Sequence, residues 1–293
     1  MPVYENRYKT WDGTPGTVMS RLLVFPRYSY MQLKGQRFVY MMLGLGWLPF
    51  LLFLVYIYLR VNVKIVESLQ ISIQHFPPVD AKYFFRFLLV QLPFLLFFTL
   101  IVGPQLISRD IRHRALPMIL SKPVNRWEYL LGKYMVLFIL LSIFSWFQGV
   151  ILFISQTAVA PKASPWREFF FSENLWILPK ILLFSFVAIT SLNLMVMMFS
   201  GVTNNPRFAT AAVIMFIIGG IIIGGIASEI FHSARWMVLS IASSVVSVGY
   251  WMFGIKNETG IPPGLGWAAL LVFWGVCLLI LSFRVKGFQL YRE

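Results

Sequence analysis

The sequence contains few acidic residues and a single cysteine. Eleven of its 293 residues are Asp or Glu, and all of them lie between long apolar runs or at the ends of those runs. Ion-coupled carriers usually keep ionisable groups at membrane depth, because coupling occurs there. With only Cys277, the chain can form neither an internal disulfide nor a thiolate metal site. The sequence therefore predicts a core without ion coupling or thiol chemistry.

Recognisable catalytic and nucleotide-binding devices are also missing. The three histidines fall in three separate connections and show no metal-ligand spacing. The Gly132-Lys133 pair does not fit a phosphate-binding loop, because Trp127 stands where the loop needs a glycine and Tyr134 where it needs Ser or Thr. The chain itself is therefore expected to bind no metal or cofactor and to catalyse no reaction.

The sequence is rich in long apolar runs. Hydrophobic residues make up 58% of the chain and charged residues 12%, whereas a soluble domain carries about 25% charged residues. Six runs are long enough to cross ~30 Å of hydrocarbon as helices. They lie at 38–59, 84–107, 134–156, 177–199, 209–227 and 264–283. The predicted fold class is an all-α polytopic membrane protein with a six-span domain at 38–283.

The Lys and Arg residues predict how the spans are oriented. Sixteen of them lie in the segment 1–37, the connections 108–133 and 200–208, and the tail 284–293, against eight in the alternate connections when Lys180, just beyond one of them, is counted. Positive residues are enriched on the cytoplasmic side of a membrane. Both termini are therefore predicted to be cytoplasmic, in a bacterial inner (plasma) membrane. The same distribution accounts for the net charge of +14 without nucleic acid as a partner.

The apolar segment 236–253 leaves two topologies open. It could be a seventh span, but it carries several small polar residues that suit a lipid-exposed helix poorly: Ser240, Ser243, Ser244, Ser247 and Gly249. A seventh span would also put the basic tail 284–293 outside. The favoured interpretation is a helix or re-entrant hairpin on the outer side, between the fifth and sixth spans.

Upstream of the first span, the segment 17–37 is predicted to form an amphipathic elbow helix in the inner interface. Its apolar face covers about a 100° arc, the width expected of such a helix. The residues in that arc are Met19, Leu22, Leu23, Pro26, Tyr30 and Leu33. Arg21 and Arg27 lie away from it. The alternative is a basic segment that merely flanks the span.

Local signals predict two helix starts and one bend. Asn125 and Glu128 have the spacing of a capping box that would begin the third spanning helix. Asn205, followed by Pro206, would begin the fifth in a similar way. Pro104 interrupts the hydrogen bonding of the second span and should bend it.

Gly220 and Gly224 form a small-xxx-small face in the fifth span. Such a face lets two helices approach closely. It predicts a site of helix packing within the chain or a dimer face, and the sequence does not choose between them.

The stretch 108–133 is more organised than a plain basic connection. A charged segment that suits a short helix is followed by Pro117, by the apolar residues 118–120 and by the cap at Asn125. The charged segment contains Arg109, Asp110, Arg112, His113 and Arg114, and Arg126 directly follows the cap. That order suits docking on another protein. Asp110 and His113 could instead act as an acid–base pair.

The same stretch resembles a known family. It reads Leu106-Ile-Ser-Arg-Asp-Ile-Arg-His-Arg-Ala-Leu-Pro-Met-Ile-Leu-Ser-Lys-Pro-Val-Asn-Arg-Trp-Glu-Tyr-Leu-Leu-Gly-Lys133. It is similar to the cytoplasmic loop of ABC-2 type transporter permeases, in which a charged helix precedes a Ser-Lys/Arg-Pro-Val/Ile segment, an Arg and a Gly-Lys. The chain departs from their commoner Glu-x-x-x-Gly-Thr pattern, which leaves the subfamily and the substrate open.

The resemblance implies a permease subunit, expected to be an exporter, with an elbow helix at 17–37 and a coupling helix near 108–116. It implies separate ATP-binding subunits that hold ATP and Mg and contact Arg109, Asp110, Arg112, His113, Arg114 and Arg126. A second permease copy or a related chain would complete the pathway within the membrane lipid.

Two further classes of function stay open at this point. One is a polytopic membrane enzyme acting on lipid head groups, for which Asp110 and His113 are the cytoplasmic candidates. The other is an ion-coupled secondary carrier, which the lack of charge at membrane depth disfavours.

Overall fold

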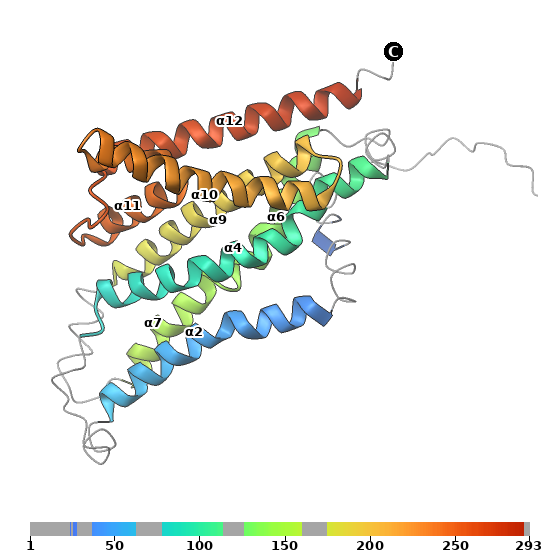
Figure 1. Ribbon diagram of the computed structural model, residues 1–293. Helices are drawn as coiled ribbons and strands as arrows, with labels where there is room; N and C mark the ends of the chain where they lie inside the picture. Colours follow the sequence, from blue (N-terminus) through green and yellow to red (C-terminus); the bar gives the residue numbers. More distant parts are fainter. Residues whose placement is uncertain are drawn as a thin grey trace, which may run out of the picture.

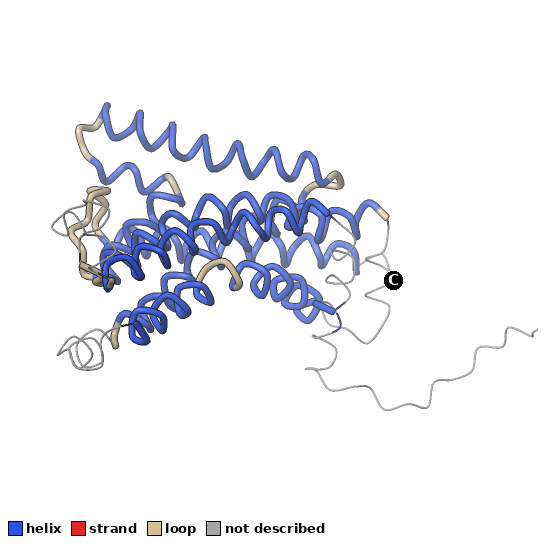
Figure 2. Tube along the Cα trace, turned by 90° about the horizontal axis from the view of Figure 1, so that it is seen from below, coloured by secondary structure: helices blue, strands red, loops and turns tan. Residues whose placement is uncertain are grey.

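The computed structural model describes residues 24, 26–27, 37–62, 78–113, 126–159 and 175–289. Every regular element in these ranges is a helix, as Figures 1 and 2 show. The helices are α2 (Arg37–Val61), α4 (Ala81–Arg112), α6 (Arg126–Ser142), α7 (Trp146–Val159), α9 (Ile177–Val202), α10 (Pro206–Ile230), the 3-10 helix η2 (Ala234–Leu239), α11 (Ile241–Phe253) and α12 (Pro263–Gln289). Most of the predicted elbow helix at 17–37 lies outside the described residues, and so does Arg114.

Six stretches of helix are long and apolar enough to cross a membrane, which confirms the prediction of an all-α multi-pass membrane protein. They are α2, α4, α6 with α7, α9, α10 and α12, and each contains one of the six predicted spans. Three bounds differ from the prediction by more than a few residues, and one of them is the end of α12, which lies six residues beyond 283. Helix α4 continues five residues beyond 107, and α6 begins eight residues before 134, because charged and polar residues extend these helices beyond their apolar parts.

The helices run alternately between two ends of the bundle. We call the end where α4 and α9 finish and α6 and α10 begin the basic end. The start of α2 and the end of α12 also lie there, since Val39 belongs to the same buried cluster as Leu106 and Ile107 and the Nε of Arg284 donates to the carbonyl of Gly201. The six spanning stretches therefore bring the start of α2 and the end of α12 to the same end of the bundle.

Helix α9 forms the centre of the described bundle. It packs against α4 along most of its length and also touches α6, α7, α10, α11 and α12. Most of its side chains are buried, because its sequence is apolar on every side. Helices α2, α10 and α12 lie at the periphery and expose many large apolar side chains. Those outer faces are of the kind that contacts lipid.

The third spanning segment is interrupted at residues 143–145, a break that the sequence analysis did not predict. No proline is present there. The amides of Phe144 and Ser145 bond to the carbonyl of Leu141 at 3.1 and 3.2 Å, and the Ser142 hydroxyl bonds back to the carbonyl of Phe138. Such serine back-bonds bend helices. The segment is therefore two helices, α6 and α7, rather than one.

A buried amide cluster lies close to this break. The side chain of Gln91 from α4 donates to Gln148 of α7, and both side-chain amides donate to the carbonyl of Gly46 in α2, at 3.2 and 3.3 Å. Both glutamine side chains are fully buried. We call these three residues the amide junction. It joins α2, α4 and α7 with no charged group.

Between α10 and α12 the chain folds back along α10. Gly220 and Gly224 lie against the backbone of η2, with ideal Cβ positions 3.2 Å from the carbonyl oxygen of Leu239 and 3.3 Å from the Cα of Met237. Helix α11 then returns toward the start of α4. Its 13 residues cover about 20 Å, less than the ~30 Å of a hydrocarbon core.

Helix α4 is fastened to its neighbours around Pro104, which lies in the helix interior. Proline gives no amide to the carbonyl of Leu100. The Thr210 hydroxyl of α10 lies 3.4 Å from that carbonyl and 3.1 Å from the carbonyl of Pro206 in its own helix, and it shares its proton between the two. The Ser200 hydroxyl of α9 donates to the Pro104 carbonyl at 2.8 Å and accepts from the Ser108 amide at 3.0 Å. The interrupted helix is thereby held to both α9 and α10.

Candidate functional site

A partly buried ion pair joins α4 to α6 at the basic end. The Lys133 ammonium lies 2.8 Å from Oδ2 of Asp110, and their side chains are 10% and 21% exposed. The hydroxyl of Tyr129 donates to the same carboxylate oxygen at 2.9 Å, and Tyr129 is fully buried. We call these three residues the ionic latch.

The spacing of the latch residues follows from helical geometry. Tyr129 and Lys133 are four residues apart on α6, so they lie on one face of that helix. Asp110 stands in the last turn of α4, two residues before Arg112. The ammonium of Lys133 also lies 5.7 Å from the centre of the Tyr129 ring, within the range of a cation–π contact. The latch therefore links the two ends of the connection between α4 and α6.

A polar groove lies at the same end, between the last turns of α4 and the first turns of α10. Its volume is about 970 Å³. The residues that line it are Gln105, Arg109, Arg112, His113, Asn205, Pro206, Arg207, Phe208 and Ala211. We call it the cationic groove, because three guanidinium groups and one imidazole line it and no carboxylate does among the described residues.

The predicted site residues are divided between these two features. Arg109, Arg112 and His113 are exposed and line the cationic groove, whereas Asp110 belongs to the ionic latch. Arg126, at the start of α6, is half-buried. Residues 108–112 continue α4, so within the described part they do not form a separate coupling helix.

The pairing of Asp110 with His113 gains no support from this arrangement. The Asp110 carboxylate contacts Lys133 and Tyr129 on α6, whereas His113 lines a groove that α6 does not reach. An acid–base pair needs both groups within hydrogen-bond reach of one reacting atom. The described His, Cys, Asp and Glu side chains likewise contain no group of three that could hold a metal ion.

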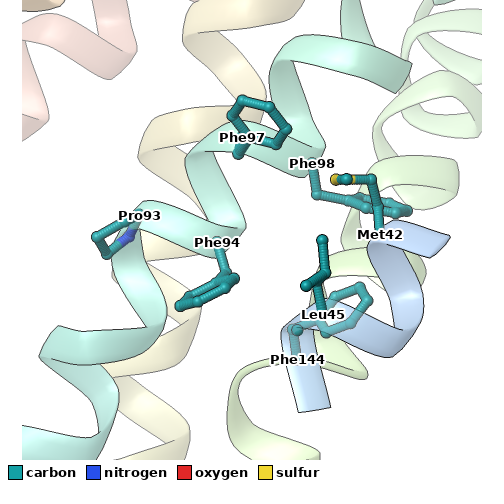
Figure 3. Close-up of a pocket in the computed structure, with 8 residues that line it drawn as sticks. Met42, Leu45, Pro93, Phe94, Phe97, Phe98 and Phe144 are labelled. Carbon is teal, nitrogen blue, oxygen red and sulfur yellow. The ribbon is translucent and has the colours of Figure 1, made fainter. Parts of the chain in front are cut away.

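An apolar pocket of about 380 Å³ lies nearer the middle of the bundle (Figure 3). Its lining comes from α2, α4 and the break between α6 and α7: Met42, Leu45, Gly46, Pro93, Phe94, Phe97, Phe98 and Phe144. None of these side chains is charged or carries a hydrogen-bonding group. The pocket adjoins the amide junction, because Gly46 belongs to both.

The sequence analysis missed the partners of the predicted residues. Lys133 and Tyr129 are paired with Asp110, and Arg207 joins Arg109 and Arg112 across the groove. The four-residue spacing of Tyr129 and Lys133 was a usable signal, since it puts a cation and a hydroxyl on one helix face. No local signal relates Arg207 to residues almost a hundred positions earlier.

Comparison with known proteins does not supply a family. The chain matches no protein-family model and no curated protein. Its function is therefore argued from its own residues and their arrangement.

Proposed function

We propose that the chain is the transmembrane permease subunit of an ATP-driven ABC-2 type transporter, an exporter whose ATP-binding subunits dock at the basic end. The observation that carries the proposal is the ionic latch. The connection that resembles the family's coupling loop has its two ends joined by Asp110, Lys133 and Tyr129. A force on that connection would therefore act on α4 and α6 together.

The placement of charge supports a driving force from outside this chain. Each described charged side chain within a spanning helix lies within eight residues of that helix's end. The polar groups at the centre are neutral amides and hydroxyls, as in the amide junction. Ion-driven carriers place titratable groups at that depth. ATP hydrolysis on a partner subunit would supply the driving force for transport without a charged group in the core.

The contacts of α4 supply a route for a movement at the basic end. Its last turns are bonded to α6 through Asp110 and to α9 through Ser108 and Ser200. The Pro104 interruption lies just before this region. A docked partner that changes conformation with its nucleotide would favour one of two tilts of this end. The hydrogen bond between Ser108 and Ser200 would transmit this tilt to the central helix α9.

In this proposal the basic end faces the cytoplasm, where the partner holds ATP and Mg. The short path of η2 and α11 is then a re-entrant hairpin entering from the outer face. Their contacts with α10 and α12, and the insufficient length of α11, support that placement. The exposed apolar faces of α2 and α10 leave room for a second permease copy or a related chain.

The test is reconstitution with a soluble ATP-binding subunit, to be sought first in the reading frames that neighbour this chain's own. The two proteins are expected to co-purify, and ATP hydrolysis in proteoliposomes should rise several-fold when the permease is present. The polypeptide alone should neither hydrolyse ATP nor transport. Transport by the isolated chain, or failure of any ATP-binding subunit to associate with it, would overturn the proposal.

A further inference from the structure

We infer that the cationic groove binds the phosphate headgroup of an anionic phospholipid. The inference requires only that the helices cross a membrane, and it does not rest on the proposed transport function. It is argued from the charge of the groove, its size, its depth and the apolar surface beside it.

The charge of the groove favours an anion. Arg109 and Arg112 reach it from α4 and Arg207 from α10, with His113 beside them. The acid nearest in sequence, Asp110, is bound to Lys133 on α6 and does not line the groove. Guanidinium groups match phosphate oxygens in geometry and can bind them in pairs. Three of them facing one cavity without a carboxylate form a phosphate-binding arrangement.

The size of the groove favours a headgroup over a free ion. Its volume of about 970 Å³ is at the upper end of ligand pockets, which span roughly 300–1,000 Å³. An inorganic phosphate would leave most of that space to water and would reach only some of the arginines. A phosphodiester with its glycerol groups can fill the groove and contact both helices.

The depth of the groove is that of lipid headgroups. Helix α10 has 25 residues and a length of about 37 Å, longer than ~30 Å of hydrocarbon, so its first turn extends to the membrane surface. Arg207 stands in that first turn. Basic pockets between spanning helices at this level are suited to anionic lipid headgroups.

An apolar stripe continues from the groove along α10. Phe208, which lines the groove, is 67% exposed, and the helical spacing places further exposed residues on the same face. These residues are Ala211, Met215, Ile218 and Ile222. From Phe208 to Ile222 the stripe is about 21 Å long, enough to cover one leaflet of roughly 15 Å. The acyl chains of a lipid whose phosphate lies at Arg207 can follow it, whereas an acidic peptide would leave the stripe unused.

The test uses native mass spectrometry of the purified chain with added phosphatidylglycerol or phosphatidylcholine. Arg207→Gln and Arg112→Gln remove groove cations, and Arg235→Gln is the matched control, since Arg235 is exposed on η2, away from the groove. Each groove substitution should weaken phosphatidylglycerol binding about fivefold, the effect of one basic residue at a membrane surface. Arg235→Gln should leave it unchanged, and phosphatidylcholine binding should be alike in all four proteins.

Two further measurements distinguish a bound lipid from the other possible occupants of the groove, which are free phosphate and a partner protein. Millimolar inorganic phosphate and soluble glycerol phosphate should not displace the lipid, and displacement by either would make the groove a site for free phosphate. If Arg207→Gln binds phosphatidylglycerol like the wild type but loses an ATP-binding partner, the groove is a protein interface. Both results would overturn the inference. Unchanged thermal unfolding of the variants, expected for exposed side chains, establishes that they are folded.

Discussion

Helix α4 is joined to the third spanning segment at two places whose chemistry differs. At the basic end, Asp110 is paired with Lys133 and Tyr129 of α6. In the middle of the bundle, Gln91 is bonded to Gln148 of α7, with the carbonyl of Gly46 as a shared acceptor. The ionic latch is partly exposed, whereas the side chains of the amide junction are fully buried.

The break at 143–145 lies between these two contacts. Helix α7 is therefore held by neutral amides and α6 by an ion pair, and the segment between them is not a continuous helix. Under the proposed function, the amide junction holds the middle of the bundle and the ionic latch transmits movement from the basic end. Each of the following predictions separates these two roles.

The largest effect is expected from Asp110→Arg. The substitution replaces an attraction with a repulsion and leaves the mostly buried Lys133 ammonium without its partner, at a cost of about 3–5 kcal/mol. Partner ATPase activity should no longer be linked to transport, while the protein still inserts in the membrane. The ratio of ATP hydrolysed to substrate moved measures this effect.

The matched control for that substitution is Glu229→Arg. Glu229 is an exposed carboxylate at the far end of α10. It should leave both the stability and the coupling ratio near wild type, because exposed charges contribute little. An Asp110→Arg protein that couples as well as Glu229→Arg would show that the latch has no role in coupling.

A smaller effect with a different pattern is expected from Gln148→Leu. It leaves the Gln91 amide and the Gly46 carbonyl with fewer partners in a dry environment, which costs about 2 kcal/mol. Thermal unfolding should occur at lower temperature, but the folded fraction should keep the wild-type coupling ratio. Asn62→Leu is the control, because Asn62 lies at the end of α2 away from the groove and, among the described residues, its side chain bonds only to the carbonyl of Tyr58 in that helix. Loss of coupling in Gln148→Leu at wild-type stability would assign the movement to the amide junction instead.

The smallest of the three effects is expected from Tyr129→Phe. This change removes one hydrogen bond to Asp110, worth about 1.5 kcal/mol, and keeps both the ring and the ion pair. Coupling should weaken only in part. Coupling as poor as in Asp110→Arg would mean that the tyrosine hydroxyl, and not the ion pair, holds the two helices.

The sequence was sufficient to predict the features that depend on local patterns. The six apolar runs gave the spans, because their length alone satisfies the hydrocarbon core. Helix α10 begins at Pro206 as predicted, whereas the predicted cap Asn125 before α6 lies outside the described residues. At α10 the signal was right about position and wrong about mechanism, since the Asn205 side chain makes no capping bond. Proline at the first position accounts for that start by itself.

The features that depend on tertiary contacts could not be predicted. The break at 143–145 has no proline, and it lies close to the contact of Gln148 with Gln91 and Gly46 from two other helices. Asp110 was placed among the docking residues together with Arg109, Arg112 and His113. Only the packing of α4 against α6 assigns it to Lys133, and only the position of α10 brings Arg207 to the groove.

The most direct measurement is a charge exchange at the ionic latch in the reconstituted transporter. Asp110→Lys and Lys133→Asp should each reduce ATP-coupled transport at least about tenfold, consistent with the loss of a buried pair. The double variant restores opposite charges across α4 and α6, and it should recover transport to within about threefold of wild type, a nonadditive result expected of groups in contact. A double variant as inactive as the single ones, or single variants that remain fully coupled, would contradict the claim that this pair transmits the movement.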